Sequence, residues 1–509
     1  MSRITAAMAA DGRTLAEPRL SPDGARLAFL STVGGVARLV VVDPADGLEV
    51  TVTTSPPPVP SRSYGGGAFD WLPDGSGLVY AATDGGLWRQ PVGGGPPVRL
   101  PTGGHGPVAC PAVSPDGTRV AYVVDTAVVA VASTDPDGPW PVRLSGGADF
   151  CLDPAWSPDG RTVAWHEWDV PNMPWDESRI VVRDADAATP AKVVGGGAGV
   201  SVSQPRWSPA GELGFVDDTS GWWNVVAGEV RIDEACEHAG ATWGPGERSW
   251  CWSPDGDEVA YTRNEDGCGA LHVRNLRTGA DVRLGRAVHG SLSWARSVRN
   301  GGDGWRIAAL RSGGVTPTSI VVYEHEAPRR VVARGPVAGV EAALVEPEVV
   351  RWAAPDGAEI PGRLYRPAAT DHGGLICWVH GGPTDQWRVE YRNRFAYFLD
   401  RGWALLVPDH RGSTGHGRAF RQALHGRWGD LDVVDCAAGL RAAAANGWGD
   451  PSRFVVMGGS AGGFTVLNLL ASEPDLCAAG VDLFGVADLF TLDETTHRYE
   501  AHYLHTIVG

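Results

Sequence analysis

Short runs in which apolar and polar residues alternate recur through the first two thirds of the chain, and each follows the tetrapeptide Ser-Pro-Asp-Gly or a close variant. Proline presets φ, aspartate can bond the turn backbone and glycine accepts a positive φ. The tetrapeptide therefore predicts a tight turn, and the run after it predicts a β-strand. Copies begin at Ser21, Leu72, Ser114, Ser157, Ser208 and Ser253.

The spacing of these copies predicts the architecture of the region. Successive copies are 51, 42, 43, 51 and 45 residues apart, and this period suits one four-stranded propeller blade. A worn seventh copy begins at Ser297, with Gly-Asp-Gly in place of the turn. We therefore predict a β-propeller of about seven blades over residues 1–345. Because a propeller is a scaffold, most of its aspartates and tryptophans are expected to be turn and packing residues.

The pattern changes after the predicted propeller. Residues 346–367 predict a β-hairpin, and three apolar strands that end in glycine-rich loops follow at 373–382, 403–412 and 453–463, with helical patterns between them. Alternating strands and helices predict a parallel sheet covered by helices on both faces. The second domain, residues 346–509, is thus expected to be α/β, with its active site at the carboxyl ends of the strands.

A serine stands where the last of these strands meets a helical pattern. Residues 458–462 read Gly-Gly-Ser-Ala-Gly, preceded by the apolar run 453–457 and followed by an apolar helical run. This G-x-S-x-G arrangement mounts a nucleophilic serine on a sharp strand-to-helix turn, so Ser460 is the candidate nucleophile. The alternative is a tight glycine turn without chemistry, which the strand–turn–helix context makes the weaker interpretation.

Two further strand ends supply candidate supporting groups. His380–Pro383 read His-Gly-Gly-Pro, and backbone N–H groups of such a glycine loop can point at a developing oxyanion. The helix after Ser460 adds a positive dipole end and the N–H of Ala461. Asp409 and Arg411, at the end of the strand between them, are interpreted as structural residues that fix their loop by hydrogen bonds.

The order of these motifs resembles the prolyl oligopeptidase family, especially its acylaminoacyl-peptidase and dipeptidyl-peptidase-like branch. A propeller precedes the motifs HGGP, RGSTGHG, GRWGDLDVVD and GGSAGG, in that order. The resemblance implies an α/β-hydrolase fold for the second domain and a serine peptidase that cleaves short peptides or acyl-peptides, with the propeller restricting entry. It also implies that Ser460 is the nucleophile and that Gly382 and Ala461 are the oxyanion donors. No cofactor and no metal are implied.

The acid and base of the triad are not found where the resemblance requires them. In this order of triad they follow the serine by roughly 80 and 110 residues, which falls beyond Gly509. The last 24 residues read as helix and loop, so we expect none of their side chains to be catalytic. The sequence therefore predicts that the triad Asp and His are absent, that the hydrolase domain is truncated and poorly stable, and that peptidase activity is low. The acidic and histidine candidates considered were Asp475, Asp482, Asp488, Asp493, His497, His502 and His505.

The stretch 166–180 is less regular than a blade strand and carries acidic groups beside aromatic ones. It predicts a loop at the mouth of the propeller, where Glu167, Asp169, Asp176 and Glu177 are candidates for binding a substrate amino group. Solvated loop carboxylates are the alternative. Glu167 is the one taken forward as a substrate-binding residue.

Composition narrows the partners and the compartment. A formal net charge of −17 argues against nucleic acid or an anionic membrane as partner. The N-terminus lacks an apolar core of signal-peptide length and no stretch approaches the roughly 18 apolar residues of a membrane span, which predicts a cytoplasmic protein. The eight cysteines show no CxxC spacing, so free thiols are expected. An esterase and a non-catalytic propeller-based binding protein remain as alternative functions, and homo-oligomerisation is left open.

Overall fold

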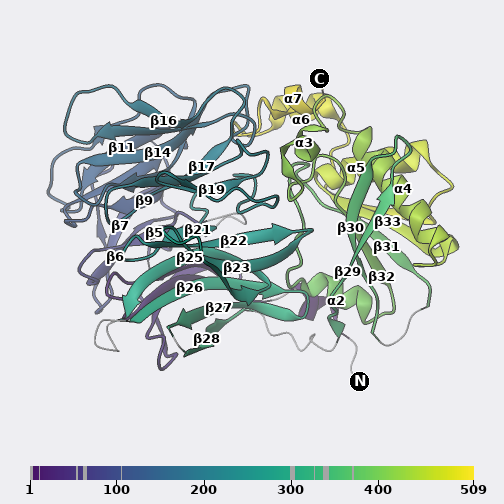
Figure 1. Cartoon of the computed structure of the whole chain (residues 1–509), viewed down its shortest axis with the longest axis horizontal. Helices are drawn as coiled ribbons and strands as arrows, with labels where there is room; N and C mark the ends of the chain where they lie inside the picture. The colour runs from purple at the N-terminus through teal and green to yellow at the C-terminus, as the bar shows by residue number, and fades with distance from the viewer. Residues whose placement is uncertain are drawn as a thin grey trace.

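The computed structural model describes residues 4–10, 12–52, 55–60, 66–104, 106–297, 304–325, 327–335, 343–368 and 372–508. Two bodies lie side by side in it (Figure 1). The purple-to-teal first part of the chain forms a ring of sheets, and the green-to-yellow remainder forms a mixed sheet with helices. This is the propeller and α/β-hydrolase architecture that the sequence predicts.

Seven four-stranded sheets form the propeller. Blades one to four are β1 (Thr14–Leu20), β2 (Leu27–Val33), β3 (Val36–Val42), β4 (Glu49–Thr51); β5 (Phe69–Trp71), β6 (Gly77–Ala81), β7 (Leu87–Pro91), β8 (Val98–Arg99); β9 (Val108–Val113), β10 (Arg119–Val124), β11 (Val128–Ser133), β12 (Val142–Arg143); and β13 (Phe150–Trp156), β14 (Thr162–Trp168), β15 (Arg179–Asp184), β16 (Lys192–Gly196). Blades five to seven are β17 (Val202–Trp207), β18 (Leu213–Asp217), β19 (Asn224–Ala227), β20 (Val230–Arg231); β21 (Trp250–Trp252), β22 (Glu258–Glu265), β23 (Cys268–Asn275), β24 (Asp281–Arg286); and β25 (Val288–Ser297), β26 (Gly304–Gly313), β27 (Thr316–Glu324), β28 (Ala327–Arg334).

Each Ser-Pro-Asp-Gly repeat is the turn between the first and second strands of a blade. In blade four the Ser157 hydroxyl donates to Asp159 at 2.6 Å and accepts from the backbone N–H of Thr162 at 2.9 Å. The same two bonds recur around Ser21, Ser114 and Ser253. The turn of the worn seventh copy, residues 298–303, lies outside the described residues, and its strand is β26.

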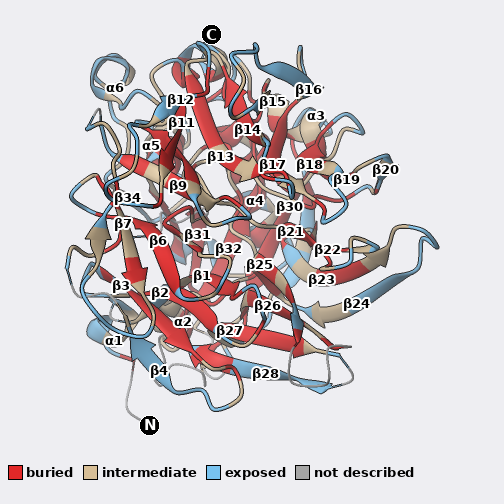
Figure 2. Ribbon diagram, turned by 90° about the vertical axis from the view of Figure 1, so that its left-hand side faces the viewer, coloured by how far each residue is buried: buried red, intermediate tan, exposed pale blue. Residues whose placement is uncertain are grey.

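A tryptophan before the turn joins each of four blades to the previous one. The indole N–H of Trp156 donates to the backbone oxygen of Ala112 at 2.9 Å, and that of Trp207 donates to Ala155 at 3.1 Å. Trp71 and Trp252 make the equivalent bonds to the blades before them. These tryptophans are packing residues, as the sequence predicts. The inner strands are buried while the outer strands β4, β16, β24 and β28 are largely exposed (Figure 2).

The ring closes without a shared sheet. Blade one and blade seven are each built from four consecutive strands, and they meet through side chains. The Ser293 hydroxyl accepts from the N–H of Leu20 at 3.0 Å, and Arg306 donates to the backbone oxygen of Gly24 at 2.8 Å. The closure of the propeller therefore rests on packing and a few directed hydrogen bonds.

The hydrolase domain contains a six-stranded sheet in the order β29-β30-β32-β31-β33-β34, antiparallel at β29–β30 and β30–β32 and parallel elsewhere. Its strands are β29 (Glu348–Ala353), β30 (Glu359–Tyr365), β31 (Leu375–Val379), β32 (Ala404–Pro408), β33 (Phe454–Gly459) and β34 (Ala479–Leu483). The helices are α1 (Ala6–Ala10), α2 (Asn393–Leu399), α3 (Gly417–Gln422), α4 (Leu431–Ala445), α5 (Ala461–Ser472), α6 (Leu489–Thr495) and α7 (Tyr503–Ile507).

Strand periodicity places helices on both faces of this sheet. Along β31, Leu375, Cys377 and Val379 pack with α4 and α5, whereas Ile376 and Trp378 pack with α2. Because successive side chains of a strand point to opposite faces, a fully apolar strand is the expected sequence for such a buried position. All five residues of β31 are buried.

The N-terminal segment packs on the hydrolase domain, although the sequence prediction assigned it to the propeller. Ile4 shares an apolar cluster with Leu344, Tyr391 and Ala396, and its N–H donates to Asp400 at 3.0 Å. The segment around Ile4 and Met8 thus contacts the second domain before the chain enters the propeller at β1. The predicted boundary after residue 345 itself falls between β28 and β29.

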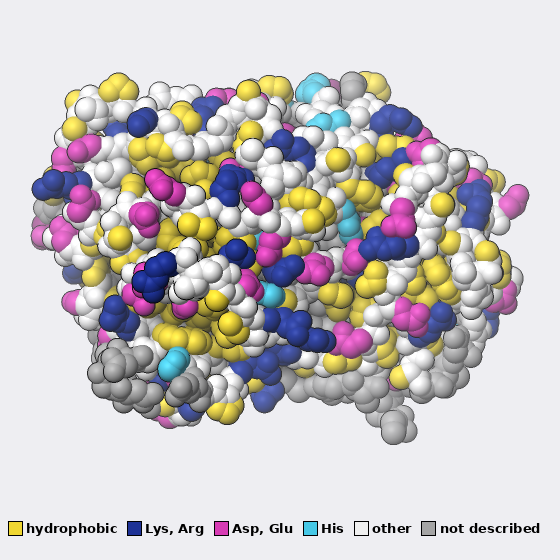
Figure 3. Space-filling view, in the orientation of Figure 1, with side chains coloured by type: hydrophobic (Ala, Val, Ile, Leu, Met, Phe, Trp, Pro, Cys, Tyr) yellow, Lys and Arg dark blue, Asp and Glu magenta, His cyan; other side chains and the backbone are white. Residues whose placement is uncertain are grey.

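Buried polar contacts join the two domains. Asp218, in the β18–β19 loop, accepts from Arg418 and from Arg421, whose Nη2 lies 3.0 Å from Asp218 Oδ2. Both Asp218 and Arg421 are buried. Charged side chains of both signs also lie along the boundary between the domains on the face shown in Figure 3. Since this boundary contains the carboxyl ends of the hydrolase strands, the candidate site lies between the domains.

Candidate active site

Ser460 occupies the sharp turn between β33 and α5. Its backbone has φ 54° and ψ −125°, a strained combination for a residue other than glycine. The side chain is exposed, while most of the residues on either side are buried. Its backbone N–H donates to the Leu483 oxygen at 3.2 Å, which ties the turn to the end of β34. The elbow predicted from G-x-S-x-G is therefore present.

The glycines around Ser460 are there because the backbone approaches too closely for a side chain. A Cβ atom on Gly458 would lie 2.3 Å from the Gly462 oxygen, and one on Gly462 would lie 2.5 Å from the carbonyl oxygens of Val379 and His380. Contacts under about 3 Å do not occur for real Cβ atoms. Close packing of α5 against β31 thus requires glycine at these two positions.

The predicted oxyanion loop lies beside the serine. β31 pairs with β33 in parallel, with Val379 opposite Gly458, so the loop after β31 and the elbow emerge at the same sheet edge. A Cβ atom on Gly381 would stand 3.6 Å from the Ser460 Cβ atom. Gly382 follows with φ 123°. Ala461 is the first residue of α5, where backbone N–H groups have no partner within the helix.

Aromatic residues from both domains surround this edge. Ala461 belongs to an apolar cluster that includes Trp175 and Trp223 of the propeller and Trp428 of the hydrolase domain, and Phe464 packs against it. The end of the chain contributes Tyr503, whose hydroxyl lies 2.6 Å from Thr384 Oγ1, directly after the HGGP loop. The serine therefore lies close to an apolar contact between the domains.

The described titratable residues after Ser460 form no hydrogen bond or ion pair with its side chain. His497 lies 3.7 Å from Glu500, His505 lies 3.7 Å from Asp493, and both histidines are mostly exposed. Asp488 caps α6 by accepting from the N–H of Phe490 at 2.9 Å. Within the described residues, no hydrogen bond or ion pair joins the Ser460 side chain to a histidine or carboxylate. The catalytic Asp and His are thus unassigned.

His380, the first residue of the HGGP motif, is structural. It is fully buried, its ring stacks on His410 at 4.6 Å, and its Nε2 lies 2.7 Å from Ser413 Oγ. Burial, together with the neighbouring His410, lowers the pKa of His380 to about 3. The ring is therefore neutral and holds the loop after β31 against the loop after β32.

Asp409 and Arg411 fix that second loop, as predicted. Asp409 is buried and accepts from Arg363 at 2.6 Å and from Gln386 at 2.7 Å, with His416 Nε2 also at 2.7 Å. Burial alone would raise the pKa of Asp409, but the Arg363 guanidinium and His416 hold it well below its usual range. Arg411 forms a paired contact with buried Asp435. Their role as structural residues is confirmed.

Glu167 lies in strand β14, paired with Cys151, and not in the mouth loop that the sequence predicted. Its carboxylate accepts from Trp165 Nε1 at 2.7 Å and from Arg179 Nε at 2.9 Å, and only 8% of the residue is exposed. Arg179 also pairs with Asp169. The loop itself spans residues 169–178, so periodicity misplaced its start by a few residues. Substrate binding by Glu167 stays a prediction. A substrate amino group would have to compete with Trp165 and Arg179 for the Glu167 carboxylate.

One group of potential metal ligands lies outside the serine site. Glu234, Cys236 and His238 converge below the surface of the propeller. The N–H of Val225 donates to His238 Nδ1 at 3.2 Å, so the proton of the neutral ring is on Nε2, which faces Glu234 at 3.0 Å. Arg263 lies 3.2 Å from the same carboxylate. A protonated Nε2 and an adjacent guanidinium do not fit a metal site.

Comparison with known proteins relates each end of the chain to a family. Residues 389–508 match the sequence profile described as "Prolyl oligopeptidase family", so this part of the chain is similar to that family. Residues 1–109 match the profile "Lipoprotein LpqB beta-propeller domain". Both matches agree with the two domains seen in the structure.

Individual relatives are peptidases by name. The chain is 35% identical over 129 residues to dipeptidyl aminopeptidase BIII of Pseudoxanthomonas mexicana. This alignment covers 25% of this chain and 19% of the relative. It is 39% identical over 101 residues to the acylamino-acid-releasing enzyme of Arabidopsis thaliana, covering 20% of this chain and 13% of the relative. These alignments span less than a fifth of the length of the curated relatives.

A solved structure matches over the whole chain. A Mycobacterium tuberculosis puromycin-hydrolyzing peptidase superposes with a TM-score of 0.88 at 28% identity, covering 100% of this chain and 83% of that one.

None of the helices in the part of this chain that the structure describes combines the length and apolar character needed to cross a bilayer. All eight cysteines are free thiols, six of them buried, which confirms that prediction.

Proposed function

We propose that this chain hydrolyses short peptides or acyl-peptides through an acyl-enzyme formed on Ser460. One observation carries the proposal: an exposed serine stands on a strained strand-to-helix turn, beside a glycine loop, in a domain similar to the prolyl oligopeptidase family. An ordinary glycine turn gives no reason for this backbone strain at a serine.

In the proposed reaction the Ser460 oxygen attacks the scissile carbonyl carbon, and the carbonyl oxygen becomes an oxyanion. The N–H groups of Gly382 and Ala461 are the proposed donors to that oxyanion, supported by the position of their loop and helix beside Ser460. The amine then leaves with a proton, and water hydrolyses the ester and restores the serine. These protons would be moved by a histidine oriented by an acid, two roles that are not assigned to any described residue around Ser460.

The substrate class is proposed from two observations. The aromatic, apolar contact between the domains beside Ser460 suits a small substrate that the propeller encloses. The match to a puromycin-hydrolyzing peptidase supports amides of a single aminoacyl group as substrates. A cytoplasmic location belongs to the same proposal and is supported by the eight free thiols.

The test uses an extended chain, in which the 509 residues are followed by the segment that comes after the matched region of the puromycin-hydrolyzing relative. We expect the extended chain to hydrolyse an acyl-peptide and puromycin. We expect the 509-residue chain to be slower by about a thousandfold or more, because no histidine among its described residues is hydrogen-bonded to Ser460 and the lack of a base costs such a triad at least that much. Turnover is measured by release of the free amine.

Matched variants separate the nucleophile from the fold. Ser460→Ala in the extended chain is expected to abolish turnover, while Ser472→Ala, at an exposed position of the same helix, is expected to leave it unchanged. Turnover that survives Ser460→Ala would contradict the proposal. Hydrolysis of p-nitrophenyl esters without any amide hydrolysis would favour the esterase alternative.

A further inference from the structure

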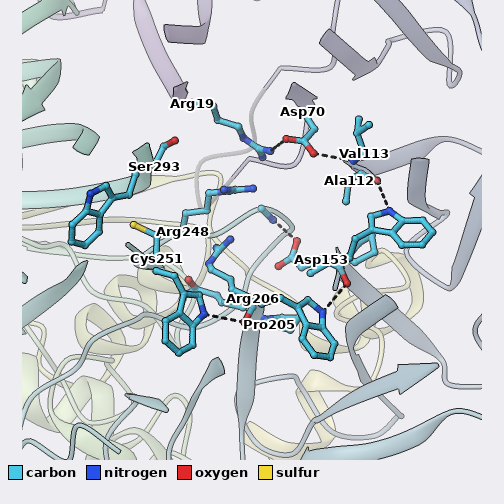
Figure 4. Close-up of a pocket in the computed structure, with 18 of the residues that line it drawn as sticks. Arg19, Asp70, Ala112, Val113, Asp153, Pro205, Arg206, Arg248, Cys251 and Ser293 are labelled. Carbon is cyan, nitrogen blue, oxygen red and sulfur yellow. Dashed lines mark hydrogen bonds and ion pairs between the residues drawn. The ribbon is translucent and has the colours of Figure 1, made fainter. Parts of the chain in front are cut away.

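A cavity of about 460 Å³ lies inside the propeller, apart from the serine site (Figure 4). The prolines of four turns, each between the first and second strands of a blade, line one end of it, among them Pro158 and Pro254. Those turns lie at the opposite ends of the strands from the β14–β15 and β18–β19 loops, which contact the hydrolase domain. At the inner end, the Gly66 N–H donates to the Pro245 oxygen at 2.7 Å, joining blades two and six.

Three arginines from different blades converge on this cavity. Arg19 comes from β1, Arg206 from β17, and Arg248 from the segment that leads into β21. Figure 4 shows the guanidinium groups of Arg206 and Arg248 extending toward the centre of the cavity and that of Arg19 beside Asp70. Burial, and then Arg19 and Arg206, lower the pKa of Arg248 well below its usual value. The three cations thus repel one another in an enclosed space.

Two of these cations lack an acidic partner. Within the described residues neither Arg206 nor Arg248 forms an ion pair. Among the described residues, Arg206 donates only to the backbone oxygen of Glu247, and its buried Nε has no partner there. Arg248 makes no side-chain hydrogen bond to any described residue. Arg206 and Arg248 are half-buried. Withdrawing a cation from water without a partner is costly, so a native protein that retains two such cations has a reason for doing so.

The nearby carboxylates do not neutralise this pair. Glu17 and Asp70 lie beside Arg19, at 3.4 and 3.3 Å. Asp153 accepts from the Gly246 N–H at 2.7 Å, and burial raises its pKa. Burial also raises the pKa of Glu247 well above its usual value. Asp153 attracts Arg206 and Asp70 attracts Arg248 at longer range, but among the described residues neither carboxylate forms a hydrogen bond or ion pair with these two arginines.

We propose that this cavity binds a small ligand through an oxyanion group, a phosphate ester or a carboxylate, held by Arg206 and Arg248. Guanidinium groups bind both kinds of oxyanion in a bidentate manner. The indole rings of Trp156, Trp207 and Trp252 line the wall and leave room for an organic body beyond the anionic group. Such a ligand would connect Arg206 of blade five with Arg248 of blade six, and its negative charge would also attract Arg19 of blade one. These contacts would help to hold together a ring that is not closed by a shared sheet.

The experiment measures binding and thermal unfolding of the 509-residue chain in a Bis-Tris propane chloride buffer at fixed ionic strength. Inorganic phosphate, phenyl phosphate and citrate are titrated separately. We expect at least one to bind at submillimolar concentration and to raise Tm, and their relative affinities decide between phosphate and carboxylate. Sodium chloride at equal ionic strength should not change Tm.

Arginine variants locate the binding. Arg206→Gln and Arg248→Gln should each weaken binding about tenfold or more, because each removes a charge-assisted hydrogen bond to the anion. Arg441→Gln, in an exposed ion pair with Glu473, is the control and should bind like the parent. Without ligand, Arg248→Gln should have an equal or higher Tm, since an unpaired cation is removed. A merely structural arginine would instead lower Tm when replaced.

A modification experiment gives a second measurement that requires no variant. Phenylglyoxal modifies accessible arginines, and the bound ligand should protect the peptides that contain Arg206 and Arg248. The proposal is overturned if none of the three ligands binds the parent chain, if binding persists in both variants, or if protection falls only on other arginines.

Discussion

Gly462 packs directly on the backbone of His380, so that a Cβ atom on Gly462 would lie 2.5 Å from the His380 carbonyl oxygen. This contact holds helix α5, which begins one residue after Ser460, against the strand that leads to the HGGP loop. The position of the nucleophile relative to its proposed oxyanion donors therefore depends on the absence of one side chain.

Gly462→Ala should consequently disturb both stability and the site. Inserting a methyl group against fixed backbone costs about 1–3 kcal/mol of unfolding free energy. It should also displace Ser460 and reduce labelling by a fluorophosphonate in the extended chain. Gly146→Ala, where an added Cβ meets nothing within 4 Å, is the control. Equal urea midpoints for the two variants would contradict the close packing.

Asp218 should be the strongest single polar contact between the domains. Asp218→Ala leaves Arg421, which is 2% exposed, without its buried carboxylate, and we expect a loss of about 3–5 kcal/mol. Glu473→Gln, which breaks the exposed pair with Arg441, should cost no more than about 1 kcal/mol. Urea unfolding monitored by tryptophan fluorescence measures both. A loss for Asp218→Ala as small as that for Glu473→Gln would show that the domains do not depend on this pair.

His166 should make the propeller sensitive to acid. Its ring is fully buried beside Trp168, neither ring nitrogen has a hydrogen-bond partner in the described part of the chain, and burial lowers its pKa to about 3. The unfolded chain binds a proton below about pH 6.5 while the folded chain does not, so stability is retained above that pH and falls as the pH drops toward 3.

His166→Phe should remove that contribution. The difference in unfolding free energy between the variant and the parent should be about 2–3 kcal/mol more favourable to the variant at pH 4.5 than at pH 7.5. This follows from about 1.4 kcal/mol per pKa unit. His497→Gln, at a mostly exposed position, should leave the pH dependence unchanged. Parallel stability curves for the parent and His166→Phe between pH 4.5 and 7.5 would refute the assignment.

Much of this architecture was predictable because its signals are local. The Ser-Pro-Asp-Gly turns form hydrogen bonds within five residues, so the repeat revealed the blades directly. The elbow was equally local, since the glycines around Ser460 reflect close backbone contacts. By contrast, Glu167 was misplaced because the end of strand β14 depends on its pairing with β13 and β15. The packing of Ile4 against Asp400 joins residues almost 400 positions apart, and no local pattern indicates it.

The three arginines of the propeller cavity were missed for a similar reason. Arg19, Arg206 and Arg248 lie in separate repeats and become neighbours only when the ring closes. The sequence signal of each arginine is a single cation a few residues before the Ser-Pro-x-Gly turn of its blade, which does not distinguish it from an ordinary surface residue. The cavity could therefore be recognised only in the folded structure.

The location of covalent labelling tests most directly whether Ser460 is the nucleophile. The extended chain is treated with a fluorophosphonate, digested and analysed by peptide mass spectrometry. We expect one phosphonylated residue, Ser460, with labelling lost in Ser460→Ala and retained in Ser472→Ala. Labelling at another residue, or equal labelling after Ser460→Ala, would show that Ser460 is not the nucleophile.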